Sequence, residues 1–93
     1  THLKLGVSMK CDDGNISLSV SNKGNRWPNF GEVRVYRTSN ETVVKKRSLL
    51  LARGQTVTFN VDAKMYGSEE MGLWVKPLWY ARDFKYDAVI NCG

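Results

Sequence analysis

The fold is decided by the stretch LLLARGQTVTFNV, residues 49–61. It predicts the apolar end of one strand, a tight turn at Arg53-Gly54, and a second strand with Val57, Phe59 and Val61 on one face. Side chains two residues apart in an extended chain point the same way, so these three must be buried against a core. The same period of two continues on both sides of the stretch.

The part of the chain before this stretch reads as strands separated by turns. Alternation of apolar and polar residues predicts strands at 3–11, 16–20 and 32–37, and one or two bulged strand pieces at 42–51. Residues 12–15 and 38–41 have turn chemistry, rich in Asp, Asn, Gly and Ser. The polar residues 21–31, rich in Gly and Asn, predict the longest loop.

The part after the stretch continues the pattern. Residues 62–70 predict a loop with room for a short turn of helix, and alternation at 71–75 predicts a sixth strand. Pro77 has no amide hydrogen, so this strand bends or ends there, or lies at an edge. After a turn at 78–83, we expect a last strand with these residues on one side: Phe84, Tyr86, Ala88, Ile90 and Cys92.

Seven short strands with turns between them predict an all-β, immunoglobulin-like antiparallel β-sandwich, a single domain over residues 1–93. The first and seventh strands then run in the same direction, which brings Cys11 and Cys92 to the same end. A disulfide needs Cα atoms about 4.4–6.8 Å apart, and side-by-side packing of these strands would supply that. The alternatives are a small closed β-barrel with the same bridge, and two buried thiols.

Composition places the chain among ordinary globular proteins, with 93 residues, 42% hydrophobic and 25% charged. No apolar run approaches the roughly 20 residues needed to cross a bilayer, so no membrane span is expected. An even cysteine count in a small domain is typical of an oxidising compartment. We therefore expect a secreted, periplasmic or cell-surface protein.

The net charge of +5 is concentrated between residues 34 and 53, where one acid, Glu41, stands among six cations. This basic set is a candidate site for an anionic polymer: Arg34, Arg37, Lys45, Lys46, Arg47 and Arg53. Consecutive residues of a strand cannot all face one way, so the alternative is a solvated edge strand protected by its charges. No aromatic-studded nucleic-acid motif accompanies the set, and nucleic acid is not expected as a partner.

Aromatic residues in turns form the second candidate site. Trp27 beside Pro28, Phe30, and Trp79-Tyr80 after Pro77 are difficult to bury from such positions. Exposed loop aromatics can anchor a protein partner or stack on a sugar ring. By contrast, we expect Phe84 and Tyr86 to face the core and Trp74 to cover one sheet.

Residues for catalysis or metal binding are scarce. The single histidine, His2, lies next to the chain terminus, and a nucleophilic Ser or Cys needs a base. Glu69 and Glu70 are adjacent in a polar segment, and neither zinc spacing nor a full calcium loop is present. We expect no enzyme, no metal and no cofactor.

Three segments carry a resemblance to a known family: LSVSNKG at 18–24, VRVY at 33–36 and LARGQTVTF at 51–59. From Ile16 to Val61 the chain resembles the immunoglobulin-like modules known as cell-adhesion-related domains found in bacteria. The resemblance implies an extracellular, non-enzymatic spacer or adhesion unit without catalytic residues. The terminal cysteine pair and the aromatic, basic residues 77–86 depart from that pattern.

These observations favour a non-catalytic, secreted or surface-exposed binding module. It would engage a protein or glycan, or an anionic polymer, through its loop aromatics and basic strands. One alternative is a secreted inhibitor or toxin-like effector that blocks a partner with residues 25–31 or 76–83. Another is a carbohydrate-binding module that uses Trp79 and Tyr80.

Overall fold

The computed structural model describes residues 3–12, 14–62 and 69–92, and within them the chain forms strands and no helix. The seven strands are β1 (Leu5–Asp12), β2 (Asn15–Asn22), β3 (Gly31–Arg37), β4 (Thr42–Leu49), β5 (Thr56–Asp62), β6 (Glu70–Pro77) and β7 (Ala88–Asn91). The predicted all-β class and number of strands are confirmed.

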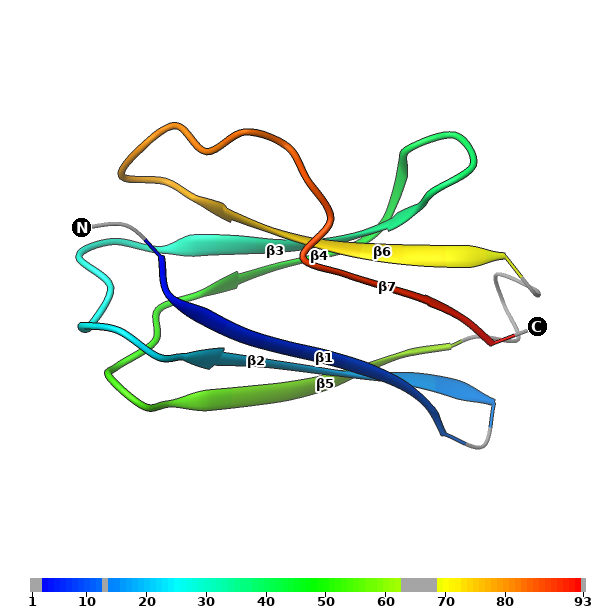
Figure 1. Cartoon of the computed structure of the whole chain (residues 1–93), viewed down its shortest axis with the longest axis horizontal. Helices are drawn as coiled ribbons and strands as arrows, with labels where there is room; N and C mark the ends of the chain where they lie inside the picture. Colours follow the sequence, from blue (N-terminus) through cyan, green and yellow to red (C-terminus); the bar gives the residue numbers. More distant parts are fainter. Residues whose placement is uncertain (1–2, 13, 63–68, 93) are drawn as a thin grey trace.

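The strands form two antiparallel sheets, of order β1-β2-β5 and β4-β3-β6-β7. Figure 1 shows them as two layers, β3, β4 and β6 above and β1, β2 and β5 below. Each sheet keeps two edge strands, so the molecule is a sandwich and the barrel alternative is wrong. The fourth strand joins the sheet of the third, whereas in constant-type immunoglobulin domains it pairs with the fifth.

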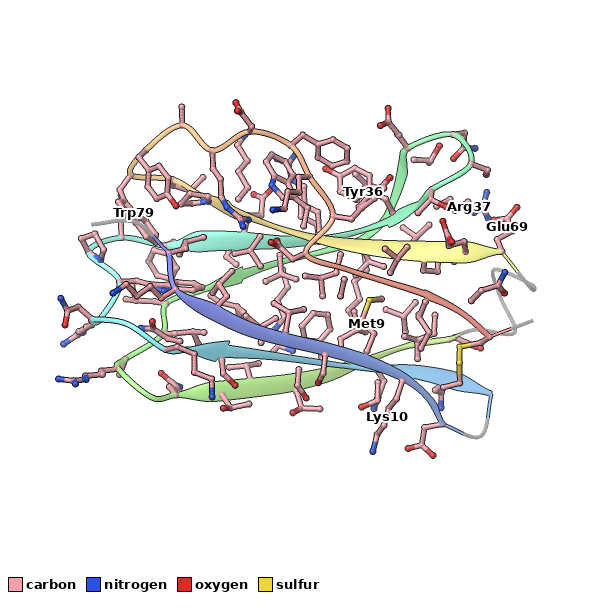
Figure 2. All side chains as sticks on the ribbon, in the orientation of Figure 1. Met9, Lys10, Tyr36, Arg37, Glu69 and Trp79 are labelled. Atoms are coloured by element: carbon pink, nitrogen blue, oxygen red, sulfur yellow. A yellow bond between two sulfur atoms is a disulfide. The ribbon has the colours of Figure 1, made fainter. Side chains whose placement is uncertain are left out.

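The core lies between the sheets and is built from alternate residues of the strands. Figure 2 shows the alternation at two neighbours, because Met9 points between the layers and Lys10 points away from them. The inward residues of both sheets form one cluster with two residues from neighbouring segments. The three-stranded sheet contributes Ile16, Leu18, Val20, Phe59 and Val61. The four-stranded sheet contributes Val33, Val35, Leu49, Met71, Leu73 and Val75, and the adjacent segments contribute Trp27 and Leu51.

Cys11 and Cys92 form the predicted disulfide, with their Cα atoms 5.7 Å apart. The bridge joins β1, an edge strand of one sheet, to the end of β7, an edge strand of the other. The two edge strands pack against each other along the same side of the sandwich. The disulfide therefore closes this side covalently.

The end of the sandwich opposite the disulfide is organised by Asn22, a buried polar residue at the end of β2. The side-chain nitrogen Nδ2 of Asn22 donates to the carbonyl oxygens of Asn25, Leu51 and Ala52 at 2.9–3.2 Å. Its backbone pairs with the turn before β5, where Gly54 adopts a φ of 78° that favours glycine. One buried side chain thus holds the β2–β3 loop against the predicted Arg53-Gly54 turn.

The predicted bulge in the fourth strand is present. Val35 pairs with Lys45 but Tyr36 pairs with Val43, so Val44 is an extra residue on β4. Val44 packs against the core cluster. The bulge lets β4 place Val44 and Lys45, two neighbours in sequence, toward the interior.

The predicted last strand is wrong at its beginning. Strand pairing starts at Ala88, and residues 78–87 arch over the outer face of the four-stranded sheet instead (Figure 1). Phe84, which is 42% exposed, and Tyr86 pack there against Tyr36, so neither faces the core. Most of the predicted loop at 62–70, residues 63–68, lies outside the described residues.

Removal of the disulfide should destabilise the fold strongly. The bridge spans 81 residues of sequence, and loop closure of this size contributes about 4–5 kcal/mol to the free energy of unfolding. The double substitution C11S/C92S should therefore remove much of the stability of a domain this small, measured by urea unfolding of both proteins. A loss below about 1 kcal/mol would contradict this account.

Candidate interaction surface

The outer face of the three-stranded sheet is polar along its length. The register places Ser17, Ser19 and Ser21 of β2 beside Asn60, Thr58 and Thr56 of β5. The Ser19 and Thr58 hydroxyl oxygens lie 3.1 Å apart, and those of Ser21 and Thr56 lie 2.7 Å apart. We call these six residues the polar face, and their short side chains are compatible with full solvation.

The outer face of the four-stranded sheet has the opposite character. Val43 and Val89 lie in one row with Tyr36 and Gly72. Gly31, Leu49 and Pro77 form a buried, inward-facing row. Their sequence neighbours Phe30, Leu50 and Leu78 therefore point outward. We call this outer side the apolar face, and its exposed large hydrophobic residues form two groups with the rows of Arg34 and Glu32 between them: Val43, Phe84 and Val89 near Tyr36, and Phe30, Leu50 and Leu78 just beyond the strand ends.

An aromatic cluster of four rings covers the middle of the apolar face. Phe84 contacts Tyr36, Trp74 and Tyr86 with ring centroids 5.0–5.2 Å apart, and Tyr36 and Tyr86 are 6.0 Å apart. The interplanar angles of 61–87° are edge-to-face geometries, which aromatic pairs prefer. Figure 2 shows Tyr36 above the upper layer, beneath the arching segment.

Gly72 makes room for this cluster. A Cβ atom at residue 72 would lie 2.5 Å from a ring carbon of Tyr86, closer than any stable contact. Every larger residue at this outward position of β6 would push the Tyr86 ring off the sheet. Gly72 is therefore the residue that allows the arching segment to lie flat.

Arg82 and Asp87 hold the arching segment at the edge of β6. The Asp87 amide donates to Leu73 O at 2.7 Å, the Val75 amide donates to Asp87 Oδ2 at 2.9 Å, and Arg82 Nη1 donates to Val75 O at 2.8 Å. Arg82 and Asp87 also form a two-point ion pair at 2.6 and 2.9 Å. Hydrogen bonding to Asp87 raises the pKa of Arg82 above its ordinary value. Beyond Leu73, where β7 no longer pairs with β6, the side chains of Arg82 and Asp87 therefore bond the backbone of Val75.

Cations surround the cluster on the same face. The Arg34 guanidinium lies 5.9 Å from the centre of the Trp74 ring and forms an ion pair with Glu32. Hydrogen bonds to Tyr36 and to Glu32 raise the pKa of Arg34 above its ordinary value. The same register row places Lys46 beside Arg34, and the next row places Lys76 beside Glu32.

The four aromatics predicted as partner anchors are not equally accessible. Trp27 is only 3% exposed, so its predicted exposure is wrong. It packs on Trp79 at 5.7 Å and over Gly31, and its amide donates to Leu51 O. Trp79, at one end of the sandwich in Figure 2, and Tyr80 are half-buried, whereas Phe30 is 47% exposed.

The six predicted polyanion-binding cations are spread over several sides of the molecule. Arg34 and Lys46 lie on the apolar face, whereas Lys45 and Arg47 point inward over the ring of Phe59 at 5.6 and 5.7 Å. Arg53 is in the β4–β5 turn, and Arg37 forms an ion pair with Glu69 at 3.0 Å (Figure 2). The structure therefore brings only two of the six together on one outward face.

Sequence reasoning missed the aromatic cluster and the Arg82–Asp87 pair. The alternation predicts Phe84 and Tyr86 in the core because residues two apart share a side of the chain, but the pattern does not tell which side is buried. A glycine at 72, inside an otherwise apolar strand, is the available signal, because it often marks close approach of another group.

The described residues contain no group of three or more His, Cys, Asp or Glu side chains that could hold a metal ion. In the same residues, no helix is long and apolar enough to cross a membrane. Comparison of the chain with protein-family models, curated proteins and solved structures finds no match. The surface is therefore interpreted from its own residues.

The substitution Gly72→Ala should destabilise the protein by about 1–3 kcal/mol, the usual cost of forcing an extra carbon into a packed site. The added methyl must displace the Tyr86 ring, so the near-ultraviolet circular dichroism of the aromatic cluster should also weaken. In a Tyr86→Ala background the clash is gone, and the same change should cost much less. Equal costs in the two backgrounds would contradict this contact.

Tyr86 should ionise at higher pH in the folded protein than in the unfolded chain. Burial, followed by the charges of Glu41, Tyr36 and Glu70, raises its pKa above 10.0. Because Tyr86 holds its proton more tightly in the folded state, its protonation stabilises the fold. This stabilisation is complete below pH ~10, the ordinary pKa of tyrosine, and is lost as the pH rises above it. The difference in alkaline absorbance titration between the wild type and Tyr86→Phe isolates this hydroxyl, and a midpoint at or below 10 would contradict the assignment.

Proposed function

We propose that the protein is a non-catalytic binding module that docks a protein partner through the apolar face of the four-stranded sheet. One observation carries the proposal: the six exposed large hydrophobic residues of the described chain share this face. They form two groups, one around the aromatic cluster and one at the other end of the face, with the rows of Arg34 and Glu32 between them. Grouped exposed apolar residues on a soluble protein mark an interaction site more often than scattered ones do. The polar face of the other sheet provides the internal contrast.

The geometry of the aromatic cluster suits recognition. Phe84 is 42% exposed although its ring contacts three others. The ring is therefore already ordered before a partner binds, and little conformational entropy remains to be lost. Arg82 and Asp87 fix the same segment to β6. A pre-ordered aromatic anchor of this kind is typical of interface hot spots.

The charges around the apolar face indicate the chemistry of the partner. Lys46 and Lys85 are exposed and Lys76 is half-exposed, and none forms an ion pair with the described residues. Charges at the rim of an interface contribute chiefly to the association rate and to the choice of partner. The complementary partner has an apolar centre bordered by acidic side chains.

Two other partner classes have less support. The tilt of 64° between Trp79 and Tyr80, and of 46° between Trp27 and Trp79, differs from the coplanar rings expected of a sugar-binding platform. An anionic polymer would need its cations along one track, and the six cations occupy different sides. Both classes remain predictions, and a secreted inhibitor would be one form of the protein-binding module.

The disulfide is typical of an oxidising compartment. The resemblance of residues 16–61 to bacterial cell-adhesion-related domains supports the same kind of setting. We therefore propose that the module acts as a secreted, periplasmic or surface-exposed protein.

A binding experiment tests the proposed surface. The immobilised protein is used to isolate a partner from extracellular proteins of its source, and the purified partner is titrated calorimetrically. The substitutions Val43→Ser and Leu78→Ser change exposed residues of the apolar face and should together weaken binding about tenfold or more. Added salt should weaken binding further, because the rim charges are exposed.

The matched control changes the other face. Ser19→Ala and Thr58→Ala remove exposed hydroxyls from the polar face and should leave the dissociation constant unchanged. The reverse result, with loss of binding only in the polar-face variant, would contradict the proposal. Isolation of a glycan in place of a protein would contradict it as well.

A further inference from the structure

The two sheets have unequal widths, and this leaves one strand position vacant. β1 packs against β7 on the side closed by the disulfide. Counted from that side, β2 and β5 come to face β6 and β3, and among the described strands none lies opposite β4. The vacant position lies beside β5 and opposite β4.

The edge of β5 presents backbone groups that no strand of the described chain pairs with. The Asn22 amide donates to Gln55 O at 2.9 Å, so Gln55 directs its carbonyl oxygen toward β2. Backbone groups of a strand alternate in direction, so those of Val57, Phe59 and Val61 also point to β2. The backbone N–H and C=O groups of Thr56, Thr58 and Asn60 therefore point to the open edge. In agreement, Asn60 O accepts a hydrogen bond from Lys45 Nζ at 2.9 Å.

β5 is the edge strand with the least protection against strand pairing. β4 has a bulge and three consecutive cations, β7 has four residues, and β1 is tied to β7 by the disulfide. Edge strands are usually protected by charges, prolines, bulges or short length. β5 contains no proline and a single charge, Asp62 at its end, and its register with β2 is regular.

Two cations face the vacant position. Lys45 and Arg47 pair with Val35 and Val33, whose side chains are buried, so they occupy inward positions of β4. With no strand opposite, both reach across to the Phe59 ring of β5. Inward positions of a strand are normally apolar, so this pair gives the vacant position a specific charge.

We infer that the edge of β5 is a strand-addition site for an extended acidic segment of a partner protein. The added strand pairs its backbone with Thr56, Thr58 and Asn60 and takes the place of Lys45 Nζ at Asn60 O, the mode by which extended peptides extend a sheet. Side chains alternate along that strand, so every second one points inward toward Lys45 and Arg47. Carboxylates at those inward positions neutralise both cations.

The same cations exclude other strands. A basic strand would meet like charge, and an apolar strand would bury Lys45 and Arg47 without a counter-ion, which carries a large desolvation penalty. Specificity of this kind arises from a penalty on the wrong partner as much as from affinity for the right one. The site is separate from the apolar face, because its pairing edge belongs to the other sheet and Lys45 and Arg47 point to the opposite side of β4 from Val43.

Hydrogen exchange with a peptide probe tests this inference. In the free protein, the amides of Thr56, Thr58 and Asn60 should exchange quickly, and those of Val57, Phe59 and Val61 slowly. A blocked nine-residue peptide of alternating Thr and Glu should bind and slow exchange of the first three amides about tenfold or more. A peptide of the same length that alternates Thr and Lys should leave them unchanged.

Charge variants provide the matched controls. The neutral variant Lys45→Gln/Arg47→Gln should lose the preference for the Thr-Glu peptide, and Lys45→Glu/Arg47→Glu should bind the Thr-Lys peptide instead. Circular dichroism verifies that each variant is folded. The Val43→Ser/Leu78→Ser protein should bind the Thr-Glu peptide normally, which separates this site from the proposed function.

Three results would overturn the inference. The first is protection of the Thr56, Thr58 and Asn60 amides in the free protein, and the second is equal binding of the two peptides. The third is self-association of the neutral variant while the wild type ignores the Thr-Glu peptide. In that last case Lys45 and Arg47 serve only to keep the β5 edge unpaired.

Discussion

Packing a four-stranded sheet on a three-stranded one is the constraint on which the rest of this structure depends. On the side of β1 and β7 the two sheets end together, and the disulfide can join them. On the opposite side β4 extends past the other sheet, so its inward positions cannot all be buried. Lys45 and Arg47 occupy those positions and cover Phe59 with their side chains. Long cationic side chains suit this place because their stems can lie on apolar surface while their charges stay hydrated.

The outer face of the four-stranded sheet depends on a second mismatch, between β6 and β7. β7 pairs with Glu70 to Leu73 and leaves the backbone of Val75 at an open edge. The side chains of Arg82 and Asp87 hydrogen-bond the N–H and C=O groups of Val75, so no further residues of β7 are needed to pair with this part of β6. The segment between them is thereby free to cross the sheet, and it delivers Phe84 and Tyr86 to a face that already carries Tyr36 and Trp74. The same hydrogen bonds that complete the edge therefore create the aromatic surface.

Local alternation is sufficient to predict most strands and the disulfide, because strands such as β2 and β5 have one buried and one solvated face. It is insufficient wherever both faces of a strand are covered. For Phe84 and Tyr86 the period of two fixes a shared side but not whether that side is the core. Trp27 depends on Gly31 and Trp79, which are remote contacts that no local pattern reports. For Lys45 and Arg47 the inward direction depends on the bulge at Val44 and on the missing strand opposite β4, which are properties of the whole sandwich.

The two surfaces use different physical means of recognition, and this follows from their places in the fold. A sheet face offers side chains, so its selectivity comes from the shape of the Phe84 cluster and the charges around it. A sheet edge offers backbone groups, which are the same for every sequence, so selectivity there must come from neighbouring side chains. Lys45 and Arg47 are the charged residues placed to supply it, because they are the cations that reach over β5. The disulfide closes the opposite side, so a partner on the face and a strand on the edge would occupy separate parts of the domain.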